Sequence, residues 1–290
     1  MIATLTAITL MALVATSRVE YTALTSETID GVPMSNPQGL AVNLRTEEFL
    51  VADALNDRIL IFDTTGALVF DFTLGDDRHN PLGIAVNAAE EIIVGAMDRS
   101  ELWVYDYSGE YLNTIDLPLG VLPGRLLIDS TGAILVINRA GHEVLRLDAG
   151  GAVVAKYESP EEICKPSGIC FDNRGDLFLV STAGAAVTAF DLSGKKYFSL
   201  GVHGSKPENF SHPTSAAVDD AGELWVVDSF RHELKHFDSN HKFMGVVGGR
   251  GTSAGDFFFP IDIKITPGGK MGVLEKGSGR LQIFRIGYGN

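Results

Sequence analysis

The sequence has few cysteines and no cysteine motif that would hold a metal or a haem. Only two of its 290 residues are Cys, and neither a Cys-x-x-Cys pair nor a Cys-x-x-Cys-His motif occurs. These absences exclude zinc ribbons and covalently attached haem. Cys164 and Cys170 lie six positions apart. In an exported protein they could form a disulfide. We favour the other interpretation, in which Cys170 is a small buried hydrophobic residue of an apolar strand.

Positive charge and long apolar runs are also scarce. Lys and Arg number 23 against 37 Asp and Glu, which leaves a net charge of −14. Because nucleic-acid affinity depends on cations that neutralise phosphates, we expect no nucleic-acid partner. The body of the chain lacks an uncharged apolar run of about 20 residues, the length that spans a bilayer. We therefore expect no membrane insertion of the mature domain, while a hydrophobic content of 45% excludes wholesale disorder.

The N-terminal segment resembles an export signal. Residues 1–17 carry no charge, Ile2 to Val14 is mainly apolar, and Ala15-Thr16-Ser17 has the small-x-small pattern of a cleavage site. We predict a signal peptide over residues 1–17, a mature chain that starts at Arg18, and an extracytoplasmic location, either periplasmic or secreted. The segment has no Lys or Arg ahead of the apolar run. An uncleaved N-terminal anchor and a misplaced start codon therefore remain alternatives.

A repeat determines the expected architecture. Six units begin with a proline, at intervals of 44, 42, 43, 47 and 47 residues: Pro37, Pro81, Pro123, Pro166, Pro213 and Pro260. Each proline is followed by two apolar runs and then by a third that ends, in five of the six units, in Asp. A more polar fourth run follows. Four strands per unit are typical of a propeller blade. We predict an all-β fold over residues 18–290, a single six-bladed β-propeller of four-stranded antiparallel blades.

The sixth unit lacks its fourth strand, and the N-terminus can supply it. Only five residues follow Phe284-Arg285, whereas residues 19–24 alternate like an edge strand. From Leu24 to Pro37 there are 13 positions, the same spacing that separates the outer strand from the proline in later units. We therefore predict that an N-terminal outer strand closes the ring, which also removes an open sheet edge.

These units resemble the NHL repeat. Pro81 to Val86 matches the family's P-x-G-[IV]-A-V element, Gly222 to Asp228 its G-x-[LI]-[WY]-V-x-D element, and Arg58 to Asp63 its R-[IV]-x-x-F-D element. The resemblance covers about residues 18–290 and implies the propeller fold. It leaves function open, because one fold hosts unrelated activities.

Related propellers suggest two metal chemistries. The peptidyl-amidoglycolate lyases hold zinc with histidines directly after the blade proline, and none of the six residues at that position here is His. The gluconolactonase-like propellers hold a divalent cation on the channel axis. Asn36, Asn80 and Asp262 could approach the channel mouth, and Ca²⁺ or another hard cation favours such oxygens. Asn before Pro is alternatively a turn residue.

The position two after the blade proline is unusual in two units. It is occupied by Arg125 in the third and Asp262 in the sixth, which lie opposite each other in a six-bladed ring. We hypothesise that both point into the channel as a polar clamp or plug, where Arg125 could meet a ligand carboxylate. A solvated pair too far apart to touch is the alternative.

Histidines gather in the fifth unit. His212 and His232 could share one face there, but a transition-metal site would need Asp228 to join them. Surface histidines are the favoured interpretation. At the opposite ends of the strands, an acidic residue opens a turn in five units, and capping explains these residues better than a basic partner does: Asp63, Asp106, Asp148, Asp191 and Asp238.

We therefore predict a non-catalytic binding scaffold for a protein, a peptide or an extracellular component, without a required cofactor. A metal-dependent propeller hydrolase or lyase, lactonase-like and with its site at the channel mouth, is the alternative. The candidate ligand-binding residues at the channel mouth are Asn36, Asn80, Arg125, His212 and Asp262.

Overall fold

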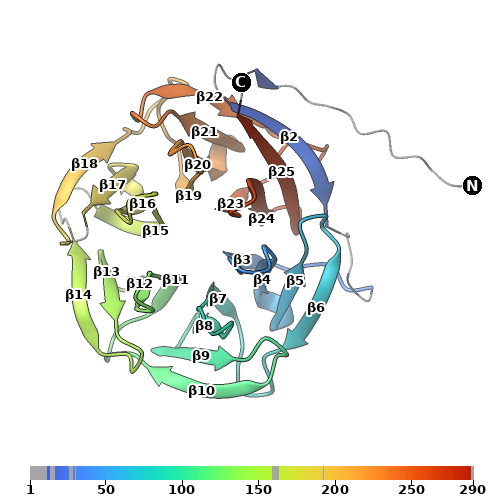
Figure 1. Ribbon diagram of the computed structural model, residues 1–290, viewed down its shortest axis with the longest axis vertical. Helices are drawn as coiled ribbons and strands as arrows, with labels where there is room; N and C mark the ends of the chain where they lie inside the picture. Colours follow the sequence, from blue (N-terminus) through green and yellow to red (C-terminus); the bar gives the residue numbers. More distant parts are fainter. Residues whose placement is uncertain are drawn as a thin grey trace, which may run out of the picture.

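A computed structural model of the chain describes residues 12–13, 17–25, 29, 31–158, 163–191 and 193–288. Six antiparallel sheets stand around a central axis, and successive sheets follow the chain around the ring (Figure 1). The predicted six-bladed propeller is confirmed. Within the described residues, no helix is long and apolar enough to cross a membrane.

The strands follow the repeat. The inner strands are β3 (Pro37–Val42), β7 (Pro81–Val86), β11 (Pro123–Ile128), β15 (Ile163–Phe171), β19 (Pro213–Val218) and β23 (Pro260–Ile265). The second strands are β4 (Phe49–Asp53), β8 (Ile92–Ala96), β12 (Ile134–Asn138), β16 (Leu177–Gly184), β20 (Leu224–Asp228) and β24 (Lys270–Glu275). The third strands are β5 (Arg58–Phe62), β9 (Glu101–Tyr105), β13 (Glu143–Leu147), β17 (Val187–Phe190), β21 (Glu233–Phe237) and β25 (Arg280–Tyr288). The outer strands are β6 (Leu68–Thr73), β10 (Tyr111–Asp116), β14 (Val153–Glu158), β18 (Lys196–Leu200), β22 (Phe243–Val247) and β2 (Ser17–Leu24).

Burial explains the two kinds of strand. Every residue of β4 and of β12 is buried, because neighbouring blades cover both faces of a middle strand, and these strands read as continuous apolar runs. The outer strand β6 is mostly exposed and mixes polar with apolar residues. The core is therefore a set of apolar layers between blades, and the hydrophobic effect holds the ring together.

Glycine two positions after the blade proline lets inner strands approach closely. A Cβ added at Gly39 would collide with the carbonyl oxygen of Leu82 in the next blade. The same addition at Gly83 would collide with the carbonyl oxygen of Gly124. The P-x-G element thus sets the inner-strand contact between the first three blades.

The fourth blade departs from the predicted pattern. Its inner strand β15 begins at Ile163, so Pro166 lies inside the strand instead of starting it. The reason is that β16 runs on to Gly184 and pairs with the extra residues, with Ile163 opposite Gly184. Proline tolerates this place because β15 is an edge strand of its own sheet.

The turns that join third and outer strands are capped by aspartate as expected. Asp63 Oδ1 accepts hydrogen bonds from the backbone N–H groups of Thr65 and Ala67, at 2.8 and 3.0 Å. Gly66 follows with φ of 81°. The carboxylate contacts recur at Asp106, Asp148, Asp191 and Asp238; the first three turns also have the glycine, and the last has His241 with a φ of 61° in its place. Each carboxylate therefore has a structural role in its turn.

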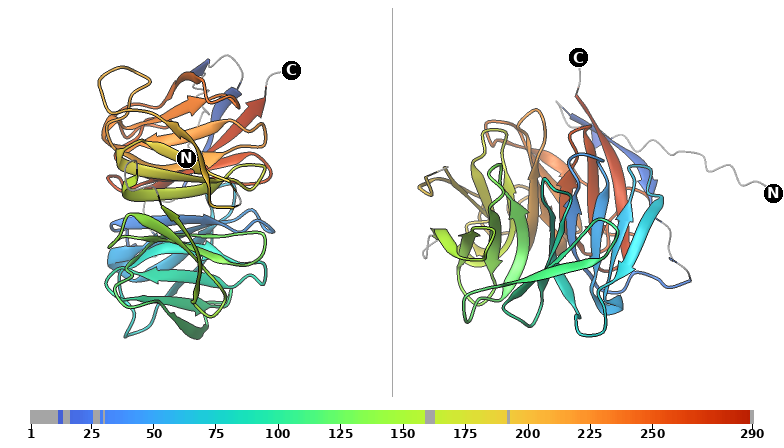
Figure 2. Two further views of the ribbon diagram at one scale, coloured as in Figure 1. Left: turned by 90° about the vertical axis from the view of Figure 1, so that its left-hand side faces the viewer. Right: turned by 60° about the horizontal axis from the view of Figure 1, so that its bottom comes forward.

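The ring closes through the N-terminal strand, as predicted. β2 pairs with β25 in an antiparallel register that places Tyr21 opposite Phe284. The two rings meet edge to face at 5.9 Å. Figure 2 shows the blue β2 lying along the red β25 at one side of the ring. The sixth blade is therefore built from both ends of the chain.

The predicted signal peptide and one of the two cysteines lie partly outside the described residues. Most of the predicted signal peptide, residues 1–17, lies outside the described residues; β1 (Ala12–Leu13) adds to the free side of β2. Cleavage stays a prediction. Cys170 is a buried free thiol on β15, and burial raises its pKa to about 12. The Cys164 side chain lies outside the described residues.

Candidate functional site: the channel plug and the aromatic ledge

The blade prolines define one face of the ring, here called the proline face. It carries the loops that precede the inner strands and the loops that follow the second strands. Buried acids at the ends of second strands fix these loops: Asp53 accepts from the N–H of Ser35 at 2.6 Å, and Glu275 from the N–H of Phe258 at 2.7 Å. The loops are therefore held in place by the blades beneath them.

Arg125 and Asp262 meet at the channel axis. Arg125 Nη1 forms an ion pair with Asp262 Oδ2. Both side chains are shielded from solvent, with exposed fractions of 11% for Arg125 and 1% for Asp262. The same guanidinium spans the ring. It donates to the carbonyl oxygens of Ser167 at 2.9 Å, Gln38 at 3.3 Å and Ile261 at 2.7 Å. We call this pair the channel plug.

The carboxylate of Asp262 is equally engaged. It accepts from Ser215 Oγ at 2.6 Å, from the Leu40 N–H at 2.9 Å and from the Ile263 N–H at 2.9 Å. Lys264 Nζ lies 3.8 Å away. The plug therefore joins blades one, three, four, five and six through the protein's own groups. The binding of an external ligand by Arg125 and Asp262 stays a prediction.

Asn36 and Asn80 serve as turn residues. Both precede a blade proline and have left-handed φ angles, 53° and 54°, which Asn tolerates better than most residues. The Asn80 N–H donates to Asp57 Oδ1 at 2.7 Å. Within the described part of the chain, no hydrogen bond joins either side chain to the channel plug. Their predicted ligand-binding role remains a prediction.

The predicted transition-metal site of the fifth blade would need His212, His232 and Asp228 as ligands, and two of these side chains already have other partners. His232 Nδ1 accepts from the Phe259 N–H at 3.0 Å, and the Asp228 carboxylate accepts from the N–H groups of Ser211 and His212, both at 2.8 Å. In the ranges that the structure describes, no three His, Cys, Asp or Glu side chains gather as a metal would require. His232 and Asp228 are thus engaged by the protein's own N–H groups, and an axial Ca²⁺ held by Asn36, Asn80 and Asp262 stays a prediction.

His212 belongs instead to a cluster of rings at the surface, the aromatic ledge, formed by His212, Phe230, His232, Phe258 and Phe259, in which His232 is buried and Phe230 and Phe259 are exposed. The His212 and Phe230 rings stack at 4.1 Å with an angle of 10° between them. Phe259 meets Phe230 at 6.3 Å and His232 at 4.6 Å, both edge to face. Phe230 is 58% exposed and Phe259 36%. A row of large apolar faces thus opens to solvent on the proline face.

The backbone holds one ring of the ledge in a strained conformation. Phe259 has a φ of 51° immediately before Pro260, although neither a bulky side chain nor a following proline favours the left-handed region. The hydrogen bond from the Phe259 N–H to Nδ1 of the buried His232 holds the Phe259 backbone in this conformation. Asn36, Asn80 and Lys165 adopt the same left-handed conformation before their blade prolines, so this backbone belongs to the repeat and here positions the Phe259 ring.

The histidines of the ledge are neutral near pH 7. Burial lowers the pKa of His212 and of His232 below the ordinary value of 6.5. The neutral form suits His232, because its Nδ1 acts as an acceptor. An uncharged ring also stacks on Phe without the cost of desolvating a charge.

The ledge was not predicted from the sequence. The signal that could have found it is the run Phe257-Phe258-Phe259 directly before Pro260, because no other unit has phenylalanine at either of the two positions that precede the blade proline. Phe257 enters the core, so only the next two rings are free for the surface.

Comparison with known proteins agrees with the geometry. No family model matches the sequence. Over 129 residues, 42% of this chain, the sequence is 26% identical to the protein brain tumor of Drosophila melanogaster, an NHL-repeat protein. The chain is an NHL-like β-propeller. The match spans 12% of that relative's length.

Solved structures share the fold of this NHL-like propeller at low identity. A streptogramin B lyase superposes with a TM-score of 0.66 and 14% identity, over 94% of this chain and 98% of the other. A gluconolactonase from Xanthomonas campestris gives 0.67 and 17%, over 93% and 90%. Virginiamycin B lyase from Staphylococcus aureus gives 0.65 and 14%, over 93% and 99%. At these identities the likeness concerns the fold alone.

Proposed function

We propose that the NHL-like propeller is an exported, non-catalytic binding scaffold that holds a protein or peptide partner on its proline face. The observation that carries the proposal is the aromatic ledge, with Phe230 and Phe259 exposed on loops that the blades hold rigidly. Rigid aromatic side chains dominate the binding energy of protein interfaces. The channel plug supports the same direction, because it fills the axis and leaves the loops as the accessible surface.

The chemistry of the ledge defines the partner. Phe and neutral His rings offer flat apolar faces, which pair best with aromatic or proline side chains of an extended peptide. Arg250 lies over the Phe258 ring at 5.9 Å and adds a cation at the edge. We therefore expect a partner segment with an exposed aromatic residue or proline and a nearby acidic residue.

Selection of displayed random peptides on the purified protein tests this proposal. We expect enriched peptides to contain aromatic residues or proline, and their affinity to fall about tenfold in Phe230→Ala, since loss of a central aromatic anchor costs 1–2 kcal/mol or more. Phe70→Ala is the matched control, because Phe70 is a 38%-exposed phenylalanine on the outer strand β6.

Two results would overturn the proposal. One is a selection in which no peptide is enriched. The other is a set of peptides that bind wild type and Phe230→Ala equally. A shared loss in Phe230→Ala and Phe70→Ala would place the binding elsewhere than on the ledge. The likeness to lyases and to a gluconolactonase concerns the fold and does not support a hydrolase or lyase activity of this chain.

A further inference from the structure

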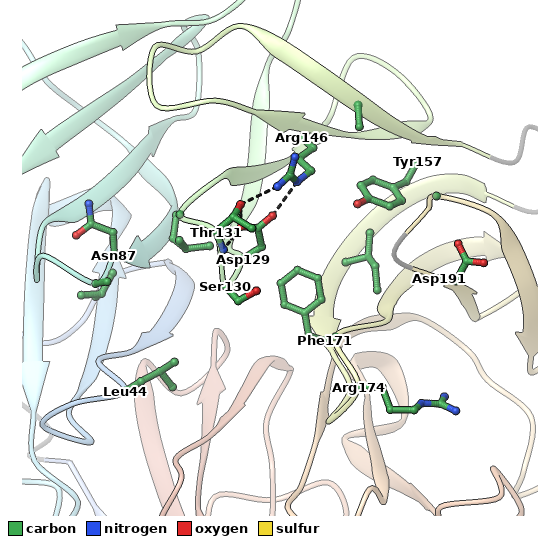
Figure 3. Close-up of a pocket in the computed structure, with 18 of the residues that line it drawn as sticks. Leu44, Asn87, Asp129, Ser130, Thr131, Arg146, Tyr157, Phe171, Arg174 and Asp191 are labelled. Atoms are coloured by element: carbon green, nitrogen blue, oxygen red, sulfur yellow. Dashed lines mark hydrogen bonds and ion pairs between the residues drawn. The ribbon is translucent and has the colours of Figure 1, made fainter.

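A large pocket opens on the face opposite the prolines. Its volume is about 1060 Å³, near the upper end for small-molecule sites. The first four blades supply turns to its wall. Most of its strand residues come from blades three and four, with Val86 from β7 of blade two, so the pocket mainly follows the seam between blades three and four. Figure 3 shows the Phe171 ring near its centre, with Arg146 and Tyr157 beyond. We call it the seam pocket.

The seam differs from its neighbours at the inner strands. Where Gly39 and Gly83 let their strands touch the next blade, blade three carries Arg125, whose Nε donates to the Ser167 carbonyl of blade four at 2.9 Å. A long side chain thus replaces the glycine contact between β11 and β15. Arg125 thus bridges this seam near the proline face, while the pocket opens at the other end of the same seam, and Arg125 is not part of its lining.

The centre of the seam pocket is apolar. Phe171 is half-buried at the end of β15, while Tyr157 and Leu177 are buried beside it. Leu44, 71% exposed, adds an apolar side chain from the first blade. An aromatic floor of this kind favours a flat apolar molecule, which would remove these surfaces from water.

The Arg146 guanidinium is held in place by two hydrogen bonds but keeps an N–H group available for a ligand. Arg146 Nε donates to Asp129 Oδ2 at 2.7 Å, and its Nη2 donates to Thr131 Oγ1 at 2.8 Å. Asp129 is itself fixed by the N–H groups of Thr131 and Ala133, at 2.8 and 3.0 Å. Arg146 Nη1 has no hydrogen-bond partner among the described residues. A preorganised guanidinium with a free donor suits an anionic oxygen.

The charge of the pocket differs from that of the chain. Its lining contains four cations against three acids, a balance of +1, within a protein of net charge −14. The cations are Arg45, Arg146, Lys156 and Arg174, and the acids are Glu90, Asp129 and Asp191. The lining itself is therefore less acidic than the chain, while Lys156 and Arg174 also pair with Glu143 and Asp172 just outside it.

We propose that the seam pocket is a second binding site, independent of the ledge, for a small amphipathic acid. Its flat apolar body lies on Phe171 and Tyr157, and its carboxylate or sulfonate accepts a hydrogen bond from Arg146.

Two fluorescent probes test the two halves of this proposal. The first, 1-anilinonaphthalene-8-sulfonate, has an apolar body and an anionic head, and the second, N-phenyl-1-naphthylamine, has the same body without the charge. We expect Phe171→Ala to weaken both probes about tenfold, as loss of an apolar floor predicts. We expect Arg146→Met to weaken only the sulfonate. Ser130→Trp, a change at an exposed turn of the lining that breaks no ion pair, should exclude both probes.

The ledge provides the control. Phe230→Ala should leave both affinities within about twofold of wild type, a change well under 1 kcal/mol. Thermal melting of every variant establishes that it is folded. Probes that bind equally to wild type, Phe171→Ala and Ser130→Trp would overturn the proposal, as would binding that Phe230→Ala abolishes or the absence of binding. If a folded Arg146→Met variant lost the same affinity for both probes, Arg146 would not be the residue that recognises the anionic group.

Discussion

The residue two positions after each blade proline sets how tightly the inner strands meet. Across the six blades this position reads Gly39, Gly83, Arg125, Gly168, Ser215 and Asp262. Glycine permits direct contact between strands, and a Cβ at Gly168 would lie 2.7 Å from Ser215 Cα. The three other residues form a polar network instead, in which Ser215 and Arg125 both bond to Asp262. One position thus provides both close packing and a charged centre.

Removal of one plug partner should be costly. Asp262→Ala leaves the Arg125 guanidinium buried without a countercharge, so we expect unfolding to become easier by about 3 kcal/mol. Urea denaturation measures it, with the exposed Asp220→Ala as control for lost charge. Arg125→Gly restores the residue of the neighbouring blades. The double variant should lose less than the sum of the single losses, and strict additivity would contradict a coupled pair.

At the scale of elements, the sixth blade depends on a strand from the far end of the chain. Val19 of β2 is buried in the same core cluster as Phe284 and Ile286 of β25. The hydroxyl of Thr22 donates to the Ile283 carbonyl at 3.0 Å. β2 therefore covers apolar surface and pairs the edge of β25, an edge that would otherwise be open to other chains.

A truncation tests the contribution of β2. A chain that starts at Thr25 should melt at a lower temperature and self-associate, because β25 is left with an unpaired edge. A chain that starts at Ser17 keeps β2 and is the control. Differential scanning calorimetry and light scattering measure the two effects. Equal melting temperatures in the two chains would show that β2 adds no stability.

The elements were more predictable than the surfaces. Inner and second strands could be placed from the sequence because burial on both faces produces continuous apolar runs, as in β4. The closure by β2 followed from the 13-residue spacing to Pro37. The contact between Arg125 and Asp262 could be proposed because six-fold geometry places the two residues opposite each other. The aromatic ledge and the seam pocket arise where loops and blades distant in sequence meet, and no local periodicity records such contacts.

At the scale of the whole molecule, buried and partly buried histidines couple stability to pH. Burial lowers the pKa of His212, His232 and His241, so the unfolded chain binds protons that the folded chain does not. Stability therefore falls as pH falls below the ordinary histidine pKa of 6.5. His79 acts in the opposite sense, because its hydrogen bond with Asp57 raises its pKa. The His79 side chain is 52% exposed, where solvent screens its pairing with Asp57, so we expect the three lowered groups to set the net direction.

We expect the melting temperature to decrease between about pH 7.5 and pH 5.5, since the folded state resists protonation of these rings. His212→Phe keeps the stack on Phe230 and removes one titrating group, so its melting temperature should depend less steeply on pH. Calorimetry across this range measures both slopes. A variant with the wild-type slope would show that His212 does not contribute.

The pairing of β2 with β25 also orders biosynthesis. Among the strands of the ring, β2 is synthesised first and β25 last, and the register that joins Tyr21 to Phe284 cannot form until translation has passed the sixth blade. The Leu40 N–H likewise waits for Asp262. Ring closure therefore reports that the whole propeller has been made. A nascent chain released early would leave the edge of β2 unpaired and Arg125 without its countercharge, two features that the closed ring conceals.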